Sequence, residues 1–202
     1  MTEDQKTKHK ILCGTKFLFF QNGFTKVTMD EIAASLRMSK KTLYRFFPSK
    51  EQLLREVLNT HINNVAGEVE KIITNDKIEY CEKLRKLFKF LGMQISSVGK
   101  PFISDLKNTT PEIWDEFDSF RQKHITSKFT RIIDEGIKKG ILRKDINRQL
   151  LIMMYSHSIS TFINPEMLTQ LPYAASEVFE SILGIIFEGI FTDKGREKYN
   201  TG

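Results

Sequence analysis

Residues 28–50 of this 202-residue chain constrain its fold more strongly than any other stretch, because they predict two short helices joined by a tight turn. The stretch opens with a capping box, in which Thr28 is followed three residues later by Glu31, and this pattern starts a helix. Ser39 predicts the start of the second helix, and Pro48 predicts its end because the residue before a proline disfavours helical backbone. A helix, a tight turn and a second helix form the unit that places its second helix in the major groove of DNA.

The excess positive charge of the chain lies in the segment that carries these two helices. The net charge is +6, and residues 1–60 contain 11 Lys and Arg against 6 Asp and Glu. The remaining residues contain 20 against 19. Cations beside a helix-turn-helix favour contact with DNA phosphates. A solvated basic surface without a ligand is the alternative that charge alone leaves open.

Several residues in and around this unit match a known pattern, namely Gly23-Phe24, the run VTMDEIA from Val27, and SK followed by TLYRFFPSKEQLL from Ser39 onward. Over residues 6–58 they resemble the N-terminal domain of TetR-type, tetracycline-repressor-like regulators. The resemblance implies an all-α chain with an N-terminal three-helix helix-turn-helix DNA-binding domain, at residues 1–48. It also implies a C-terminal helical domain, at residues 49–202, that binds an effector and forms a dimer.

Nine polar or charged residues in and beside the two helices are candidate DNA contacts: Thr28, Arg37, Ser39, Lys40, Lys41, Thr42, Tyr44, Arg45 and Lys50. Lys40, Lys41 and Thr42 are predicted at the N-terminus of the second helix, where side chains can reach base edges. Lysine suits this role because it pairs with O6 and N7 of guanine. Ser39 is expected to cap the helix, with its hydroxyl satisfied by backbone N–H groups.

The other candidates are expected to contact the DNA backbone. The resemblance assigns phosphate contacts to Thr28, Tyr44 and Lys50, and the side chains of all three can donate a hydrogen bond to a phosphate. Thr28 and Lys50 are also predicted at helix N-termini, whose free N–H groups favour an anion. Arg37 and Arg45 could reach the backbone as well, and a plain surface role is an equally strong alternative.

The rest of the chain is predicted to be helical. A first helix follows about eight frayed residues and ends at Gly23. A long helix from Ser49 to about Thr74 repeats apolar residues every three or four positions, so it links the DNA-binding part to the rest of the protein. Residues 101–108 are predicted to be too short to stand alone. Further helices are predicted over about residues 76–98, 110–139, 145–163 (ending at Asn164-Pro165) and 172–191.

The last two predicted helices have apolar residues on more than one side. Residues 150–155 read LLIMMY, and residues 178–190 are apolar apart from a narrow polar stripe. Such helices need partners on more than one side, which predicts a homodimer built as a four-helix bundle across a two-fold axis. The resemblance implies the same dimer, and a fully buried helix in a monomer is the alternative. The interface candidates are Leu151, Phe179, Ile182, Leu183, Ile186, Phe187 and Ile190.

The resemblance further implies an effector pocket between the long helices of the C-terminal domain. Aromatic and methionine residues could line it, although such residues at helical spacing are more often plain core. His157 and Tyr155 are the polar groups most suited to an apolar cavity, so a small apolar or aromatic effector is expected. The pocket candidates are Phe88, Phe102, Trp114, Phe117, Met153, Met154, Tyr155, His157 and Phe162.

These observations predict a homodimeric transcriptional repressor that binds a palindromic operator in double-stranded DNA and is released by the effector. A DNA-binding protein of the same fold controlled by protein partners, without an effector, is the alternative. A helical enzyme is a weaker one, because no paired carboxylates, nucleophile-base pair or glycine-rich phosphate loop is visible.

No metal or cofactor is expected, since the two cysteines and four histidines lack ligand spacing. No signal peptide is visible, and the most apolar stretch, residues 182–191, is short and contains Glu188. The sequence therefore predicts a protein of the cytoplasm, at the bacterial nucleoid, with no membrane partner.

Overall fold

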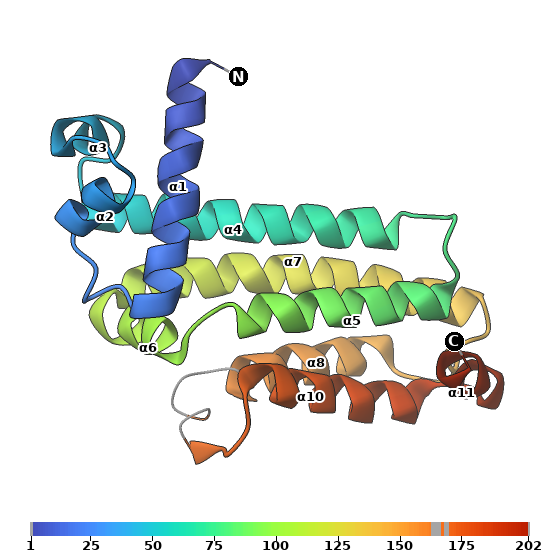
Figure 1. Ribbon diagram of the computed structural model, residues 1–202. Coiled ribbons are helices and arrows are strands. Elements are labelled where there is room, and N and C mark those ends of the chain that lie inside the picture. The colour runs from blue at the N-terminus through green and yellow to red at the C-terminus, as the bar shows by residue number, and fades with distance from the viewer. Residues whose placement is uncertain (1, 163–166, 168–169, 202) are drawn as a thin grey trace. The chain divides into compact units, whose positions relative to one another are not determined.

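The computed structural model describes residues 2–162, 167 and 170–201 (Figure 1). Within these ranges the regular structure is α-helical, which confirms the all-α prediction. The predicted helix end at Asn164-Pro165 lies outside the described residues. In chain order the helices are α1 (Glu3–Asn22), α2 (Met29–Ser35), α3 (Lys40–Phe46), α4 (Lys50–Ile73), α5 (Tyr80–Ser96), α6 (Lys100–Thr109), α7 (Pro111–Lys138), α8 (Arg148–Phe162), α10 (Ala175–Ile190) and α11 (Asp193–Asn200).

The chain forms two compact units. Unit 1 consists of Met1–Asn64 and Ser97–Ser119, and unit 2 consists of Val65–Ser96 and Phe120–Gly202. Helices α4 and α7 each contribute residues to both units. The functional boundary expected at residue 48 stays a prediction.

Local capping explains where the N-terminal helices begin and end. Thr2 and Gln5 form a capping box that starts α1 at Glu3, so the expectation that about eight residues are frayed is wrong. Thr28 and Glu31 form the predicted box before α2, and the Ser39 hydroxyl accepts from the backbone N–H of Thr42 at the start of α3. Gly23 ends α1, as predicted. Its φ of 89° suits a residue without a side chain.

Helix α6 belongs to the core of unit 1, although residues 101–108 were predicted not to stand alone. Phe102 is 2% exposed, and its ring lies 4.8 Å from that of Phe20 and 6.5 Å from that of Phe19, both on α1. The backbone N–H of Gly99 donates to the carbonyl of Phe20 at 2.9 Å. Burial against α1 therefore stabilises a helix that is too short to persist by itself.

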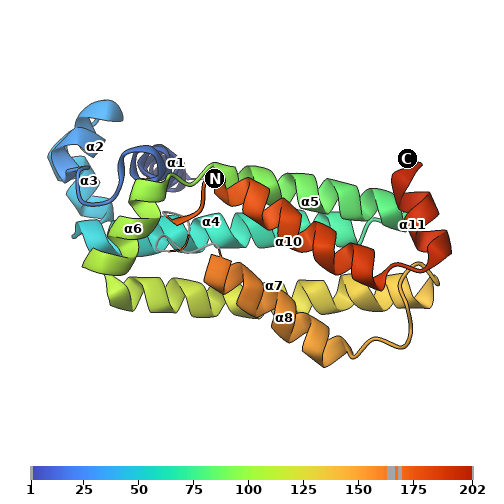
Figure 2. The same ribbon diagram turned by 90° about the horizontal axis from the view of Figure 1, so that it is seen from below.

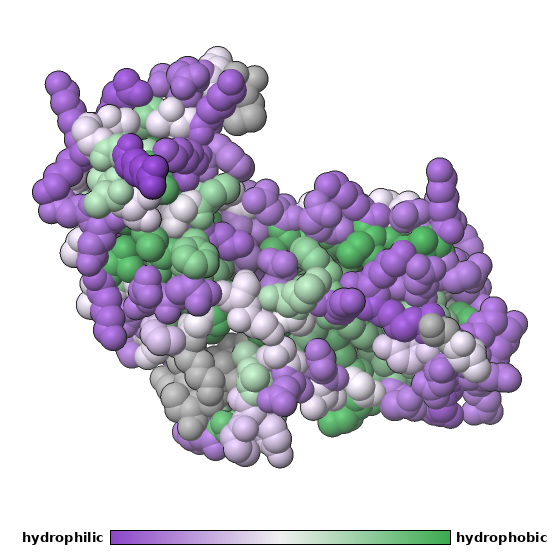
Figure 3. Space-filling model, in the orientation of Figure 1, coloured by the Kyte–Doolittle hydropathy of each residue, from purple (hydrophilic) through white to green (hydrophobic). Residues whose placement is uncertain are grey.

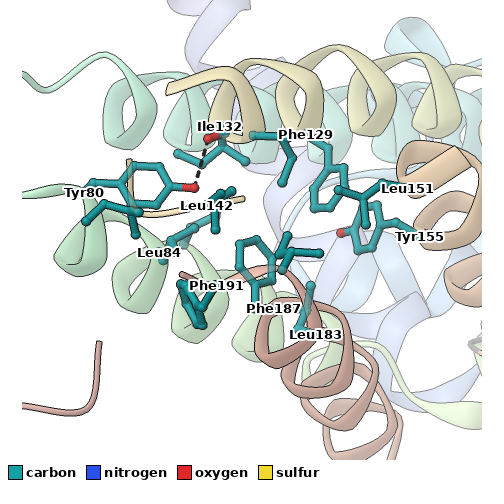
Figure 4. Packing of buried hydrophobic residues seen from close by; sticks show 14 of the residues in the cluster. Tyr80, Leu84, Phe129, Ile132, Leu142, Leu151, Tyr155, Leu183, Phe187 and Phe191 are labelled. Atoms are coloured by element: carbon teal, nitrogen blue, oxygen red, sulfur yellow. Dashed lines mark hydrogen bonds between the residues drawn. The ribbon is translucent and has the colours of Figure 1, made fainter. Parts of the chain in front are cut away.

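The core of unit 2 is rich in aromatic side chains (Figure 4). Phe129 of α7 stacks on Tyr155 of α8 with ring centroids 4.0 Å apart. Phe187 of α10 packs edge-on against Phe88 of α5 at 4.9 Å, so four helices meet around these rings. The Tyr80 hydroxyl donates to the carbonyl of Ile132 at 3.0 Å, which satisfies a polar group that is otherwise buried. Helices α8 and α10 lie side by side in both views (Figures 1 and 2).

The C-terminal helices differ from the predictions at their ends. Helix α8 begins after Asn147, whose side chain accepts from the backbone N–H of Leu150, rather than at Asp145. The carboxylate of Asp145 instead pairs with Arg143 at 2.7 Å. Helix α11 was not predicted, and it starts at the cap residue Thr192. Its Tyr199 ring lies 5.1 Å from that of Phe191, so packing on the core compensates for a polar, short sequence.

A buried lysine ties three helices of unit 2 together. The side chain of Lys83, on α5, is 2% exposed, and its ammonium donates to the carbonyl of Ile73 at the end of α4 at 2.9 Å. It also donates to both carboxylate oxygens of Glu135 on α7, at 2.9 and 3.1 Å. All three donors of the ammonium are thus used, which offsets the cost of burying a charge. Burial raises the pKa of Glu135, but the hydrogen bonds from Lys139 and Lys83 outweigh it, so the net pKa lies below the ordinary value.

We expect Lys83→Ala to lower the free energy of unfolding by about 3 kcal/mol, because it leaves Glu135 and the Ile73 carbonyl without their buried partner. Lys139→Ala removes the exposed partner of the same carboxylate and should cost less than about 1 kcal/mol. Urea denaturation measures both. The pair stabilises the fold above about pH 4.3, the unfolded pKa of Glu, and this contribution is lost as pH falls through the lowered pKa of Glu135. Equal small losses in the two variants would contradict the assignment.

Candidate nucleic-acid interface

The turn between α2 and α3 is held from both sides. Arg37 adopts a left-handed conformation with a φ of 53°, and the N–H of Met38 donates to the carbonyl of Ala33 at 3.0 Å, which closes the end of α2. The ammonium of Lys10, on α1, donates to the carbonyl of Leu36 at 2.8 Å. A Cβ at Gly14 would lie 2.3 Å from Cδ2 of Leu36, so a larger residue there requires the Leu36 side chain to move. Contacts with α1 therefore help to hold the turn between α2 and α3.

Helix α3 is anchored by its apolar residues and exposes its cations. Leu43 is fully buried and Phe47, just after the helix, is 1% exposed. On the other side of the helix, Lys40, Lys41, Tyr44 and Arg45 are exposed. Hydrophilic side chains predominate over α2 and α3 on the face drawn in Figure 3. The second helix of the unit thus presents hydrogen-bond donors on a rigid support.

Two of these cations are paired within the chain. The ammonium of Lys40 lies 2.5 Å from a carboxylate oxygen of Asp30, on α2. The guanidinium of Arg45 lies 3.0 Å from a carboxylate oxygen of Asp4, on α1. Lys41 has no ion pair among the residues described. The three lysines and arginines of α3 therefore differ in how freely they can turn to a ligand.

Lys50 and Thr28 lie at the starts of α4 and α2, and contacts within the chain hold both side chains. The ammonium of Lys50 is 3.4 Å from the carbonyl of Thr25 and 4.2 Å from the ring centroid of Phe24, and partial burial lowers its pKa. The Thr28 backbone N–H and hydroxyl both donate to the Glu31 carboxylate. Both hydrogen bonds lower the pKa of Glu31, and the one from the backbone N–H has the larger effect. A phosphate contact by Thr28 would therefore compete with its capping box.

Asp105 is a positioning residue that the sequence did not reveal. It lies on α6, and its carboxylate accepts from the backbone N–H of Thr25 at 2.9 Å, in the loop between α1 and α2. A side chain at Gly23 would meet the same carboxylate at 2.6 Å. The two partners are 80 residues apart, so no local pattern could have shown that α6 holds the loop that leads into the helix-turn-helix.

The pocket candidates occupy different surroundings. Phe102 is core of unit 1, where Trp114 and Phe117 also lie, with ring centroids 6.1 Å apart. Phe88 and Tyr155 belong to the aromatic core of unit 2. The remaining four, which are Met153, Met154, His157 and Phe162, have exposed side chains in this chain. An exposed side chain does not line the interior of its own chain, so these four are separated from the buried candidates. The pocket itself stays a prediction.

Most of the predicted interface residues are core residues instead. Leu151, Phe179, Leu183, Phe187 and Ile190 are buried within unit 2, and Ile182 and Ile186 are half-buried. A side chain that is packed in the core of its own chain offers little surface to a partner, and the assignment of these residues to the interface stays a prediction. The large apolar residues that α8 and α10 leave exposed are Leu150, Met153, Met154, Phe162 and Ile185.

A helix-turn-helix whose second helix exposes cations defines a sequence-reading DNA-binding module. Residues 11–57 match the family model of bacterial regulatory proteins of the tetR family. The chain is 30% identical over 187 residues to the HTH-type transcriptional regulator YvaF of Bacillus subtilis, covering 92% of this chain and 96% of that protein. The chain belongs to the TetR family of DNA-binding transcriptional regulators.

Solved structures share this fold. A transcriptional regulator from Cytophaga hutchinsonii superposes with a TM-score of 0.69 at 24% identity, covering 92% of this chain and 99% of that one. Thermus thermophilus FadR, a transcriptional repressor in complex with lauroyl-CoA, gives a TM-score of 0.57 at 20% identity, with 92% and 95% covered. Across the helices that the structure describes, none combines the length and apolar character needed to cross a bilayer.

We expect Lys41→Ala and Lys50→Ala to weaken DNA binding in different ways. Loss of Lys41 should cost about 1–3 kcal/mol and relax specificity at one base position, because we expect its ammonium, at the start of α3, to bind a base edge. Loss of Lys50 should weaken binding to all sequences alike and reduce the salt slope by about one, as expected for a phosphate contact. Binding titrations over several salt concentrations distinguish the two. Identical behaviour of the variants would contradict this division of roles.

Proposed function

We propose that this protein is a homodimeric transcriptional repressor that binds a palindromic operator and is released from it by a small apolar or aromatic effector. The observation that carries the proposal is helix α3, which presents Lys40, Lys41, Tyr44 and Arg45 outward from a buried anchor. Family membership supports a regulator, and FadR, which shares the fold, is described as a repressor that binds lauroyl-CoA. A protein with this role acts in the cytoplasm, at the nucleoid.

Dimerisation follows from the apolar surface that α8 and α10 leave exposed. Ile185 is 76% exposed, Met154 61% and Leu150 56%, and large apolar side chains gathered on two adjacent helices are a common mark of an interface. A side chain at Gly184 or Gly189 would meet no atom within 4 Å, so the backbone of α10 is open to close approach by another helix. A two-fold dimer presents two copies of α3 about 34–36 Å apart, or a multiple of it, and this predicts a palindromic site.

Effector control requires a path from unit 2 to α3. Helix α4 supplies one, because it contributes to both units and its N-terminus follows α3 directly. An effector acts only through its different affinities for the DNA-competent and incompetent arrangements. The aromatic packing of unit 2 supports the alternative of control by a protein partner, since the rings of Phe129, Tyr155 and Phe187 pack against one another between the helices. Lauroyl-CoA, whose acyl chain is apolar, is the first compound to test, because the FadR structure contains it.

Selection of random duplex DNA by the purified protein tests the function. We expect a palindromic consensus, and an affinity that falls steeply with salt because phosphate contacts release counterions. The selected duplex then serves to screen acyl-CoA and aromatic compounds for release. Sequence-blind binding would contradict the proposed operator, and an operator that no compound releases would favour control by a protein partner.

We expect Ile185→Glu to produce a monomer, because it places a charge in the apolar face of α8 and α10. Operator affinity should then fall toward the non-specific level, by about 10³-fold or more, since one half-site remains. Met93→Glu is the matched control, because Met93 is 53% exposed in the same unit but lies on α5. Analytical ultracentrifugation and operator titration measure both variants. If the Ile185→Glu protein stays a dimer, the exposed apolar face of α8 and α10 is not the interface.

A further inference from the structure

Two carboxylates of unit 1 occupy the cations that α3 would offer to DNA. Asp30, in the first turn of α2, pairs with Lys40, and Asp4, in the first turn of α1, pairs with Arg45. Each acidic residue is distant in sequence from its cation, by 10 and 41 positions. Two cations of α3 are therefore each paired with a carboxylate, one from α2 and one from α1.

Both pairs are exposed enough to exchange partners. The side chains of Lys40 and Asp30 are 63% and 58% exposed, and those of Arg45 and Asp4 are 63% and 74% exposed. Ion pairs in water are weak, so a phosphate or a base edge can displace either carboxylate. The displaced carboxylate then stays beside the bound anion and repels it.

The effect of the carboxylates differs between operator and other DNA. Non-specific binding consists almost wholly of phosphate contacts, so a competing carboxylate removes a large share of it. On an operator, Lys40 can also gain hydrogen bonds to guanine O6 and N7, which compensate for the lost partner. A carboxylate next to a DNA-reading cation therefore lowers affinity for all sequences but lowers it least for the correct one.

We propose that Asp30 and Asp4 are specificity-determining residues, which compete with DNA phosphates for Lys40 and Arg45 and so suppress binding to non-operator DNA. This inference rests on the proposed operator binding. A different role is available to both residues, because a carboxylate in the first turn of a helix interacts favourably with the helix dipole. The experiment must separate competition for a cation from this structural effect.

Asp30→Asn keeps the shape of the side chain and removes its charge. Affinity for non-operator duplex at about 0.1 M salt should rise about 5-fold, and the salt slope should steepen by about 0.9, as expected for one added phosphate contact. Affinity for the selected operator should rise less than about 2-fold, so the specificity ratio falls. Glu112→Gln is the matched control: Glu112 is an exposed acidic residue in the first turn of α7 in unit 1, so it changes the net charge equally.

A double-mutant cycle shows whether Asp30 acts through Lys40. The gain from Asp30→Asn on non-operator duplex is measured in the natural protein and again in a Lys40→Met background. Competition predicts that the gain is about 3-fold larger when Lys40 is present. Equal gains would show that Asp30 acts only as a distant negative charge, and no gain in either background would show a structural role. Both results overturn the proposal, as does a gain from Glu112→Gln that equals that of Asp30→Asn.

Asp4→Asn, with Arg45→Met as its background, repeats the cycle independently. Melting temperatures show whether a variant has lost helix stability, which would accompany the dipole role without a change of specificity ratio. If the natural protein selects no operator, the proposed function fails, whatever the cycle gives. If it selects an operator and the ratio is unchanged by both asparagine variants, only the present inference fails.

Discussion

Two long helices, α4 and α7, supply side chains to both hydrophobic cores, and the rest of the structure is built on that sharing. Leu53 and Leu54 of α4 are fully buried in unit 1, while Val69 and Ile73 of the same helix are buried in unit 2. Apolar residues three and four positions apart stay on one face of a helix, so its 24 residues can serve both cores without a break. The buried ammonium of Lys83 then satisfies the carbonyl at the last residue of α4, which fixes where that helix ends.

The positive charge that α3 presents depends on its ion pairs as well as on the net charge of the segment. The N-terminal segment has an excess of cations, yet Lys40 and Arg45 of α3 are each matched by a carboxylate, whereas Lys41 pairs with none in the part of the chain that the structure describes. Lys50 is held differently, between the carbonyl of Thr25 and the ring of Phe24. Non-specific attraction to DNA grows with the number of unmatched cations. A segment with a net positive charge can therefore have only moderate affinity for DNA of any sequence, while its hydrogen-bond donors stay in position.

Helices α8 and α10 each bury one apolar face and expose another. Leu151 and Phe187 face the core of their own chain, whereas Leu150 and Ile185 are exposed. The division follows from helical geometry, because adjacent residues are rotated by about 100° and cannot share one face. The inner face of each helix packs in the core of its own chain, and the outer face stays exposed for the partner that the proposed dimer requires.

The sequence by itself determined what depends on near neighbours. The capping boxes at Thr28, the cap at Ser39 and the end of α1 at Gly23 involve groups within four residues of each other, so they could be predicted, as could the family. Only the tertiary structure decided which apolar residues lie inward on α8 and α10, and that α6 persists as a helix. It also brought Asp105 to Thr25 and Glu135 to Lys83. These contacts join residues more than 50 positions apart, and the free energy that selects them comes from burial in the assembled cores, which no local pattern contains.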